Sequence, residues 1–298
     1  MAAAAPNRIS VLRNEQVVPL IPSVREPFGS TQPWDGLLLE RHRVEAIEIP
    51  EHEHRDFCLH LQLTGNDDME WWTEGRHGVE KTAPGSLILL PPGTRDRLRW
   101  QGSSDRLILS LEPDRLVHLA EELHPGSPAE FTCLWSLKDP SLQHLVSEMG
   151  REASEGWPLG SLYADLLGAG LSSQLLRRHV ANPVPAPEMK TELPMPRLRH
   201  AMEYMTANLH KDLRLEQIAR ELNLSPFHFA RVFRNTTGQT PYQYLLDQRM
   251  DRAKYFLKHH NLPVQEIAAM TGFSSSANFV RAFRQKVGVT PGAWRQSA

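Results

Sequence analysis

Apolar and polar residues alternate in short runs through the first third of the chain. The clearest runs are residues 37–44, 57–63, 86–90 and 107–111, and clusters of Gly, Pro, Asn and Asp separate them. A period of two is typical of a strand with one buried face. Many short strands between turn signals, from residue 8 to about 112, predict a β-sandwich or a β-barrel.

From residue 141 to 180 the apolar spacing changes to that of a helix. A first stripe runs from Leu142 to Met149, Trp157-Pro158 interrupts it, and a wider stripe runs from Leu159 to Leu175. This pattern predicts two amphipathic helices, the second ending in Arg177-Arg178, which suits the negative end of a helix dipole. Its apolar face could cover the strands or pair with its copy in a dimer, and periodicity does not distinguish the two.

Alternating prolines follow these helices, in the stretch 181–187 and again at Pro194 and Pro196. Such a stretch forms a stiff, extended spacer. The sequence therefore predicts a domain boundary here.

The last hundred residues contain one helical pattern twice. The first copy consists of Ile218-Ala219, Phe229, Arg231, Phe233-Arg234, Gly238 and Thr240-Pro241; the second consists of Ile267-Ala268, Phe279, Arg281, Phe283-Arg284, Gly288 and Thr290-Pro291. The offset is 49 for the first pair and 50 afterwards, so one residue is inserted in the turn between the helices. A fixed period indicates one supersecondary unit used twice.

Each copy predicts two helices with a tight turn between them. In the first copy Asn223 suits a left-handed turn, and Ser225-Pro226 suits the start of the second helix. In the second copy Gly272 is the turn and a serine between 274 and 276 is the cap. Ile267, Ala268 and Met270 are expected on the apolar side of its first helix. The segment from Thr240 to about His259 is expected to form one long connecting helix.

Charge is distributed unevenly between the two halves. Residues 190–298 hold 16 Lys and Arg against 8 Asp and Glu, whereas residues 1–189 hold 17 against 27, so a formal net charge of −2 hides a basic half and an acidic half. The basic half is the half with the repeat, which favours a nucleic-acid partner over a merely solvated helical bundle.

At these residues the segment from about Leu193 to Ala298 resembles the DNA-binding domain of the AraC/XylS family of bacterial transcription regulators. The most specific stretch is residues 272–284, followed by Gly288-Val289-Thr290-Pro291. The resemblance implies seven helices in two helix-turn-helix units, promoter DNA and RNA polymerase as partners, activation, and dimer contact through the second amphipathic helix. Ala230 departs from relatives with a polar residue there. The expected DNA-contacting residues are Phe227, His228, Ala230, Arg231, Arg234, Ser275, Ser276, Ala277, Asn278 and Arg281.

The front part resembles a cupin barrel, through His52-Glu53-His54 with Gly65, and through Gly85 with Pro91-Pro92-Gly93. In metal-binding cupins the ligands are two such histidines, a glutamate and a third histidine. Here the glutamate position falls on Cys58 or Leu59, and the last histidine position on Asp96. Because two of four positions are changed, we expect no stoichiometric metal and no cofactor. A small-molecule pocket is expected instead, with candidate contacts at His52, His54, His60, Trp71, Trp72 and Arg95.

The sequence thus predicts an α+β chain: a cupin-like sensory barrel at 1–135, a helical arm at 136–182 that dimerises, a Pro-rich linker at 183–194 and a double helix-turn-helix domain at 195–298. Two cysteines, no long apolar run and no export signal indicate a cytoplasmic protein rather than a membrane or secreted one. The expected function is a non-enzymatic, DNA-binding regulator with a small-molecule effector. A metal-dependent cupin enzyme joined to a DNA-binding module, and a regulator that acts through protein contacts alone, are the alternatives.

Overall fold

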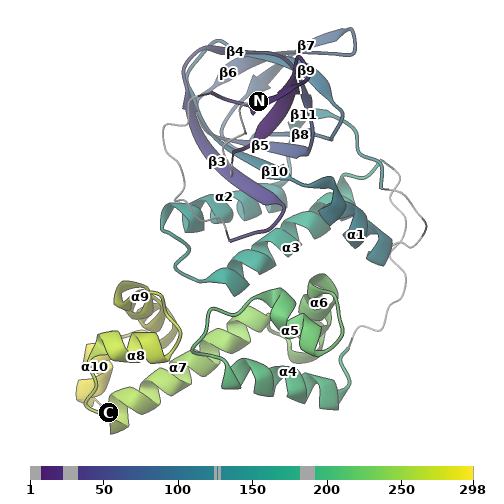
Figure 1. Cartoon of the computed structure of the whole chain (residues 1–298). Helices are drawn as coiled ribbons and strands as arrows, with labels where there is room; N and C mark the ends of the chain where they lie inside the picture. Colours follow the sequence, from purple (N-terminus) through teal and green to yellow (C-terminus); the bar gives the residue numbers. More distant parts are fainter. Residues whose placement is uncertain (1–7, 23–32, 124–125, 127–128, 182–191, 298) are drawn as a thin grey trace. The chain divides into compact units, whose positions relative to one another are not determined.

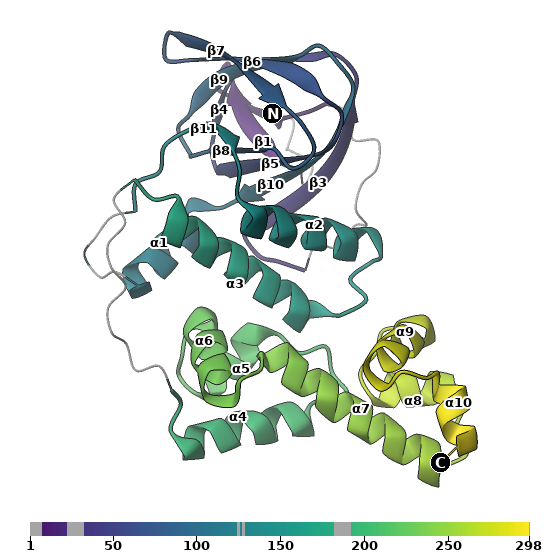
Figure 2. The same cartoon turned by 180° about the vertical axis from the view of Figure 1, so that it is seen from behind.

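A computed structural model describes residues 8–22, 33–123, 126, 129–181 and 192–297 of the chain. The chain divides into two compact units, drawn in Figures 1 and 2. The N-terminal unit comprises Met1–Gly156 and Gly170–Pro187, and the C-terminal unit comprises Trp157–Ala169 and Glu188–Ala298. Most of the expected linker, residues 183–191, lies outside the described residues.

Two antiparallel sheets form the body of the N-terminal unit. The six-stranded sheet has the order β2-β1-β4-β9-β6-β7, and the five-stranded sheet has the order β11-β8-β5-β10-β3. The strands are β1 (Ser10–Arg13), β2 (Gln16–Pro19), β3 (Leu37–Val44), β4 (Ile47–His54), β5 (Phe57–Thr64), β6 (Asp67–Thr73), β7 (Arg76–Thr82), β8 (Leu87–Leu90), β9 (Arg95–Trp100), β10 (Ser104–Leu111) and β11 (Leu134–Leu137).

The expected β-rich front domain is confirmed, but its strands form two sheets rather than a closed barrel. Among the described residues no strand pairing joins one sheet to the other. Apolar side chains from both sheets meet in one core, with Ile49 and Leu98 from the first sheet and Ile88 and Ile108 from the second. Shared burial, rather than a continuous hydrogen-bond ladder, therefore holds the two sheets together.

Three helices accompany the sheets: α1 (Pro113–Leu123), α2 (Pro140–Ser154) and α3 (Ser161–Arg178). The two expected amphipathic helices are α2 and α3, whereas α1 was not expected. Asp139 caps α2 by accepting hydrogen bonds from the backbone N–H groups of Ser141 and Leu142, and α2 packs on the face of β5 and β10.

Helix α3 contributes residues to both units. Leu171 and Leu175, in the part assigned to the N-terminal unit, are already buried within the chain. This burial removes them from the surface that a second copy could contact. Dimerisation through α3 therefore stays a prediction, and the burial of these two leucines does not support it.

The C-terminal unit holds the seven helices that the resemblance implied, within the described residues 192–297. They are α4 (Met195–Ala207), α5 (Leu215–Glu221), α6 (Pro226–Thr237), α7 (Pro241–His259), α8 (Val264–Met270), α9 (Ser276–Val287) and α10 (Pro291–Ser297). Helices α5–α6 and α8–α9 are the two helix-turn-helix units, and α7 runs between the groups α4–α6 and α8–α10 (Figure 1). The expected long connecting helix is confirmed.

Local signals set the turns of both units. Asn223 and Gly272 have positive φ angles of 51° and 80°, as the sequence predicted, and Ser225 and Ser275 cap α6 and α9. One detail was wrong: Met270, expected on the apolar side of α8, is 44% exposed. Ile267 and Ala268 alone bury that side, because the helix has only seven residues and ends there.

Candidate nucleic-acid interface and a buried histidine cluster

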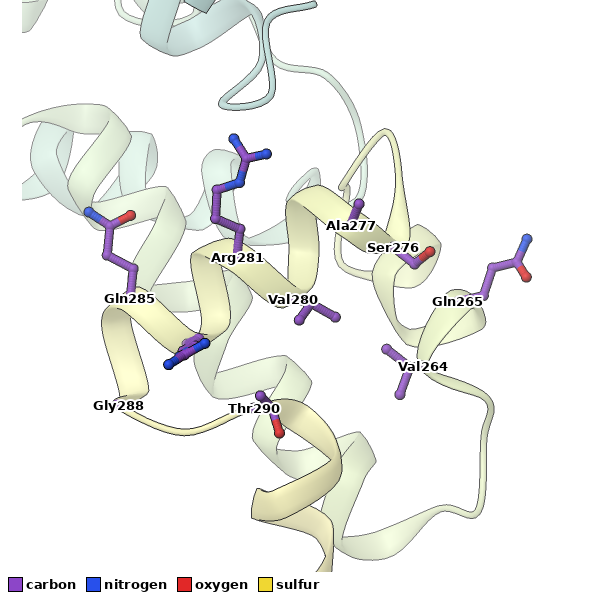
Figure 3. A pocket seen from close by; sticks show the side chains of 10 residues that line it. Val264, Gln265, Ser276, Ala277, Val280, Arg281, Gln285, Gly288 and Thr290 are labelled. Atoms are coloured by element: carbon purple, nitrogen blue, oxygen red, sulfur yellow. The ribbon is translucent and has the colours of Figure 1, made fainter. Parts of the chain in front are cut away.

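Helix α9 presents a polar, exposed side and buries the opposite one. The Ser275 hydroxyl accepts a hydrogen bond from the Asn278 backbone N–H at 3.1 Å, which fixes the start of the helix. Its apolar side is fully buried and consists of Phe279, Ala282 and Phe283. Ala277, Arg281 and Gln285 are exposed, and Figure 3 shows them along one side of the helix. Because they recur every four residues, they form one continuous stripe.

Helix α6 has the same construction with a different surface. Ser225 caps it through the His228 backbone N–H at 3.1 Å, and Phe229, Val232 and Phe233 are buried. Arg231, the counterpart of Arg281, is half-buried, and its guanidinium lies 6.0 Å from the centre of the Phe227 ring. Arg231 is therefore less exposed than Arg281 and lies near an aromatic ring.

None of the ten expected DNA-contacting residues is buried. Arg234, Ser275, Ala277 and Arg281 are exposed. The others are half-buried: Phe227, His228, Ala230, Arg231, Ser276 and Asn278. Their contacts with DNA stay predictions. Gln285 was not among the expected residues, although its position four residues after Arg281 places it on the same side of the helix.

An open groove of about 980 Å³ lies beside α9. Figure 3 shows Val264 and Gln265, from the start of α8, facing Ser276 and Val280 across it. Its remaining lining comes from Ala277, Arg281, Arg284, Gln285, Gly288 and Thr290. One side of α9 is therefore open, and the side chains on it are accessible.

A buried arginine on α7 contacts both the loop that precedes the first helix-turn-helix unit and the turn of the second unit. Arg249 is 6% exposed, and its guanidinium donates hydrogen bonds to the carbonyls of Leu209 at 2.9 Å and Lys211 at 2.8 Å. The same group lies 5.6 Å from the Phe273 ring and against Gly272, in the turn of the second unit. It therefore joins the loop after α4 to the α8–α9 turn, and we call this contact the Arg249 joint. In the sequence, Arg249 is only one residue of the expected connecting helix.

The second candidate site lies between β4 and β9 of the N-terminal unit. His52 pairs directly with Asp96 across the two strands, and His54 is two residues further along β4, on the same face. The side chains of all three are at most 2% exposed. We call His52, His54 and Asp96 the histidine–aspartate cluster.

Short distances separate the polar atoms of this cluster. Asp96 Oδ1 lies 3.0 Å from His54 Nε2 and 3.9 Å from His52 Nε2, and the potential ligand atoms all fall within 4.8 Å of one another. Neither Nε2 atom nor either Asp96 oxygen has a hydrogen-bond partner of good geometry among the described residues. Four buried polar atoms thus lie close together, and none of them makes a hydrogen bond among the described residues.

The protonation state of His52 follows from its surroundings. Burial lowers the pKa of His52 and so favours the neutral ring, although the nearby Asp96 acts in the opposite direction. His52 Nδ1 lies 2.9 Å from the Pro50 carbonyl, which can only accept, so the ring proton is on Nδ1. Nε2 then carries a lone pair directed at the cluster.

Further polar groups line the interior of the N-terminal unit. His60 is buried, its Nε2 lies 3.2 Å from Cys58 Sγ, and burial together with Arg106 holds its pKa well below the usual value. Arg106 is buried as well, with its guanidinium 4.4 Å from the Trp100 ring centre and a hydrogen bond to Gln62. An interior with this many polar groups differs from an ordinary apolar core.

Two expected pocket residues are elsewhere, which corrects the sequence-based set. Arg95 is exposed and paired with Glu53 at 2.7 Å, and Trp72 lies on the outer side of its strand beneath Arg97, at 4.7 Å. Both residues neighbour inward positions, and strand alternation turns them outward. Trp71 faces inward but stacks on Trp135 at 4.8 Å, which is a packing role.

The repeat in the C-terminal unit matches known proteins. A family described as "Helix-turn-helix domain" matches residues 218–297. Regulatory protein PocR of Salmonella typhimurium is 37% identical over 100 residues, which are 34% of this chain and 33% of PocR. The transcriptional activator RhaR of Shigella dysenteriae is 28% identical over 264 residues, covering 82% of this chain and 86% of RhaR.

A solved structure of a transcriptional regulator with an AraC-type DNA-binding domain, from Chromobacterium violaceum, is 30% identical to this chain. It covers 34% of this chain and 90% of its own length, with a TM-score of 0.33. For most of the curated relatives it matches, the chain spans only about half of their length or less. No helix in the described residues combines the length and hydropathy that a membrane crossing requires.

Proposed function

We propose that this chain, which belongs to the AraC/XylS family of transcription regulators, binds promoter DNA through two recognition helices and controls transcription from that site. The observation that carries the proposal is the pair of helix-turn-helix units on one connecting helix, each with an exposed or half-exposed arginine at the same position.

The dimensions of the connecting helix support binding to two neighbouring grooves. Helix α7 has 19 residues, so it is about 28 Å long at 1.5 Å per residue. Successive major grooves on one face of DNA are about 34 Å apart. We therefore propose that α6 and α9 enter adjacent major grooves of one duplex.

The two helices differ in how they would recognise bases. Arg281 is exposed, and a guanidinium at such a position can donate two hydrogen bonds to a guanine. Arg231 is half-buried and lies 6.0 Å from the centre of the Phe227 ring, so its reach toward a base is shorter. Ala230 and Ala277 are small and apolar, which suits contact with a thymine methyl group.

Arg281→Ala is expected to weaken binding to a preferred duplex by about 1–3 kcal/mol and to relax the preference at one base pair. The preferred duplex would be selected from a random library with the full chain, and affinity measured for it and for a random duplex. The control is Arg252→Ala, which removes an exposed charge from α7 outside the recognition helices. An equal loss on both duplexes for Arg281→Ala would identify a phosphate contact instead.

A hydroxyl-radical footprint of the full chain on the selected duplex tests the two-groove geometry. The proposal requires protection at two places one helical turn apart for each chain. Protection of a single groove would contradict it.

For the N-terminal unit we propose a sensory role, with a small polar molecule as effector. The polar interior with His52, His54, His60 and Arg106 supports this assignment. An effector would act by binding one arrangement of the protein better than another. Activation, contact with RNA polymerase and homodimer formation are further parts of the proposal, suggested by the name of RhaR as an activator and by the family. A regulator that uses its front half only for protein contacts is one alternative, and a metal-dependent enzyme joined to a DNA-binding module is the other.

A further inference from the structure

We propose that the histidine–aspartate cluster of His52, His54 and Asp96 binds a divalent first-row transition metal ion. This inference concerns the N-terminal unit alone and does not depend on DNA binding. It reverses the expectation from the sequence, which counted Asp96 among the changed positions. The structure places Asp96 directly opposite His52, where a carboxylate serves as the third ligand.

The backbone of β4 brings both histidines to the inner face. The pairing of β4 with β9 shifts register between Ile49 and His52. Ile49, His52 and His54 are buried, whereas Pro50 and Glu51 are exposed, so the irregularity falls at these two residues. Proline is accommodated at such bulges, because it cannot donate to the ladder. Without the extra residue, strict alternation from Ile49 would turn Glu51 and Glu53 inward in place of the histidines.

The ligand atoms have the chemistry and spacing of a metal site. Two imidazoles and one carboxylate form a set that iron, zinc, nickel, cobalt and manganese accept, with further positions left for water or a small molecule. Donor atoms about 2.1 Å from an ion lie about 3.0–3.4 Å apart at neighbouring positions. The observed 3.0 and 3.9 Å between Asp96 Oδ1 and the two Nε2 atoms bracket this spacing.

A second contact orients one ligand. His52 Nδ1 donates its proton to the Pro50 carbonyl at 2.9 Å, so that Nε2 presents a lone pair to the cluster. Hydrogen bonds of this kind to the non-ligating nitrogen fix the tautomer and ring orientation of metal-binding histidines. Pro50 therefore has two effects. It lies in the bulge that turns His52 inward, and its carbonyl orients the His52 ring.

The energy of the buried carboxylate favours a bound cation. Both Asp96 oxygens lack a hydrogen-bond partner, and among the described residues only the rings of His52 and His54 lie within 4 Å as possible ion-pair partners. A buried, unsatisfied carboxylate is destabilising by several kcal/mol. The rival account is a proton on His54, giving a buried ion pair with Asp96 and no metal. Metal content separates the two.

The test uses the full chain without a histidine tag. After chelation and buffer exchange, the protein is titrated with Co²⁺, with binding followed by visible absorption and stoichiometry by elemental analysis. The expected result is one Co²⁺ per chain. Asp96→Asn, which keeps the shape and removes the charge, should weaken binding by at least about 100-fold, because losing a ligand exceeds the 10–100-fold effect of losing its outer support. Asp96→His should retain binding, because it supplies another nitrogen ligand.

The control is Asp105→Asn, which removes a different buried carboxylate, paired with Arg41 at 2.6 Å. It should leave Co²⁺ binding unchanged. Circular dichroism establishes that each variant is folded, and Asp96→His provides a second measurement if Asp96→Asn does not fold. Absence of Co²⁺ uptake by the folded wild type, or equal uptake by wild type and Asp96→Asn, would overturn the proposal in favour of the protonated pair.

Discussion

Replacing Arg249 by methionine is expected to lower the free energy of unfolding of the C-terminal unit by about 3 kcal/mol or more. The change keeps an apolar stem of similar length but removes two charge-assisted hydrogen bonds, to the carbonyls of Leu209 and Lys211. Each such bond contributes about 1.5–3 kcal/mol, and its loss leaves carbonyls at a partly buried site unpaired. Because Arg249 also lies over Phe273, the effect should reach the second helix-turn-helix unit.

Local stability is best measured by amide hydrogen exchange on the full chain, which reports α5–α6 and α8–α9 separately. Faster exchange is expected in both helix-turn-helix units. Arg252→Met is the matched control on the same helix: it is exposed, and its guanidinium lies 4.8 Å from the Phe256 ring, so a loss below about 1 kcal/mol is expected. If Arg249→Met proved no more destabilising than Arg252→Met, the Arg249 joint would not connect the loop after α4 with the turn of the second helix-turn-helix unit.

Gly272→Ala is expected to have an effect of similar or greater size, about 3 kcal/mol or more. Gly272 has a φ of +80°, which costs a residue with a side chain about 1–2 kcal/mol. In addition, a Cβ at this position would overlap the Leu209 carbonyl and the Arg249 guanidinium. The turn would have to move away from the Arg249 joint, so both stability and affinity for the selected duplex should fall.

Gly288→Ala separates the two causes. Gly288 also has a positive φ, of +90°, but nothing lies within 4 Å of a Cβ built on it. It should therefore show the conformational cost alone, about 1–2 kcal/mol, in thermal unfolding of the full chain. Similar losses at the two glycines would mean that close contact with the Arg249 joint contributes nothing.

Much of the C-terminal unit could be predicted because its signals are local. The repeat predicted the two pairs of helices and the long helix between them, and the family resemblance implied the total of seven. Asn223 and Gly272 marked the turns. Ser225, and one of the serines at 274–276, marked the starts of α6 and α9. Capping and turn formation depend on residues within three or four positions, so a single sequence contains what determines them.

The Arg249 joint could not be found this way. Its partners Leu209 and Lys211 are 40 and 38 residues away, and they offer backbone carbonyls that no residue type reveals. The exposure of Met270 was missed for a related reason, since a short helix buries only those positions that its neighbours cover. Contacts set by tertiary packing leave no periodic trace in the sequence.

In the N-terminal unit, local patterns predicted a β-rich region, several of its strands and the motif with His52 and His54. Local patterns did not show that the strands form two facing sheets or that the histidines meet Asp96, since both depend on long-range strand pairing. The physical reason is register. One extra residue at the β4 bulge exchanges the two faces of the strand, and pairing with β9 determines where that bulge falls.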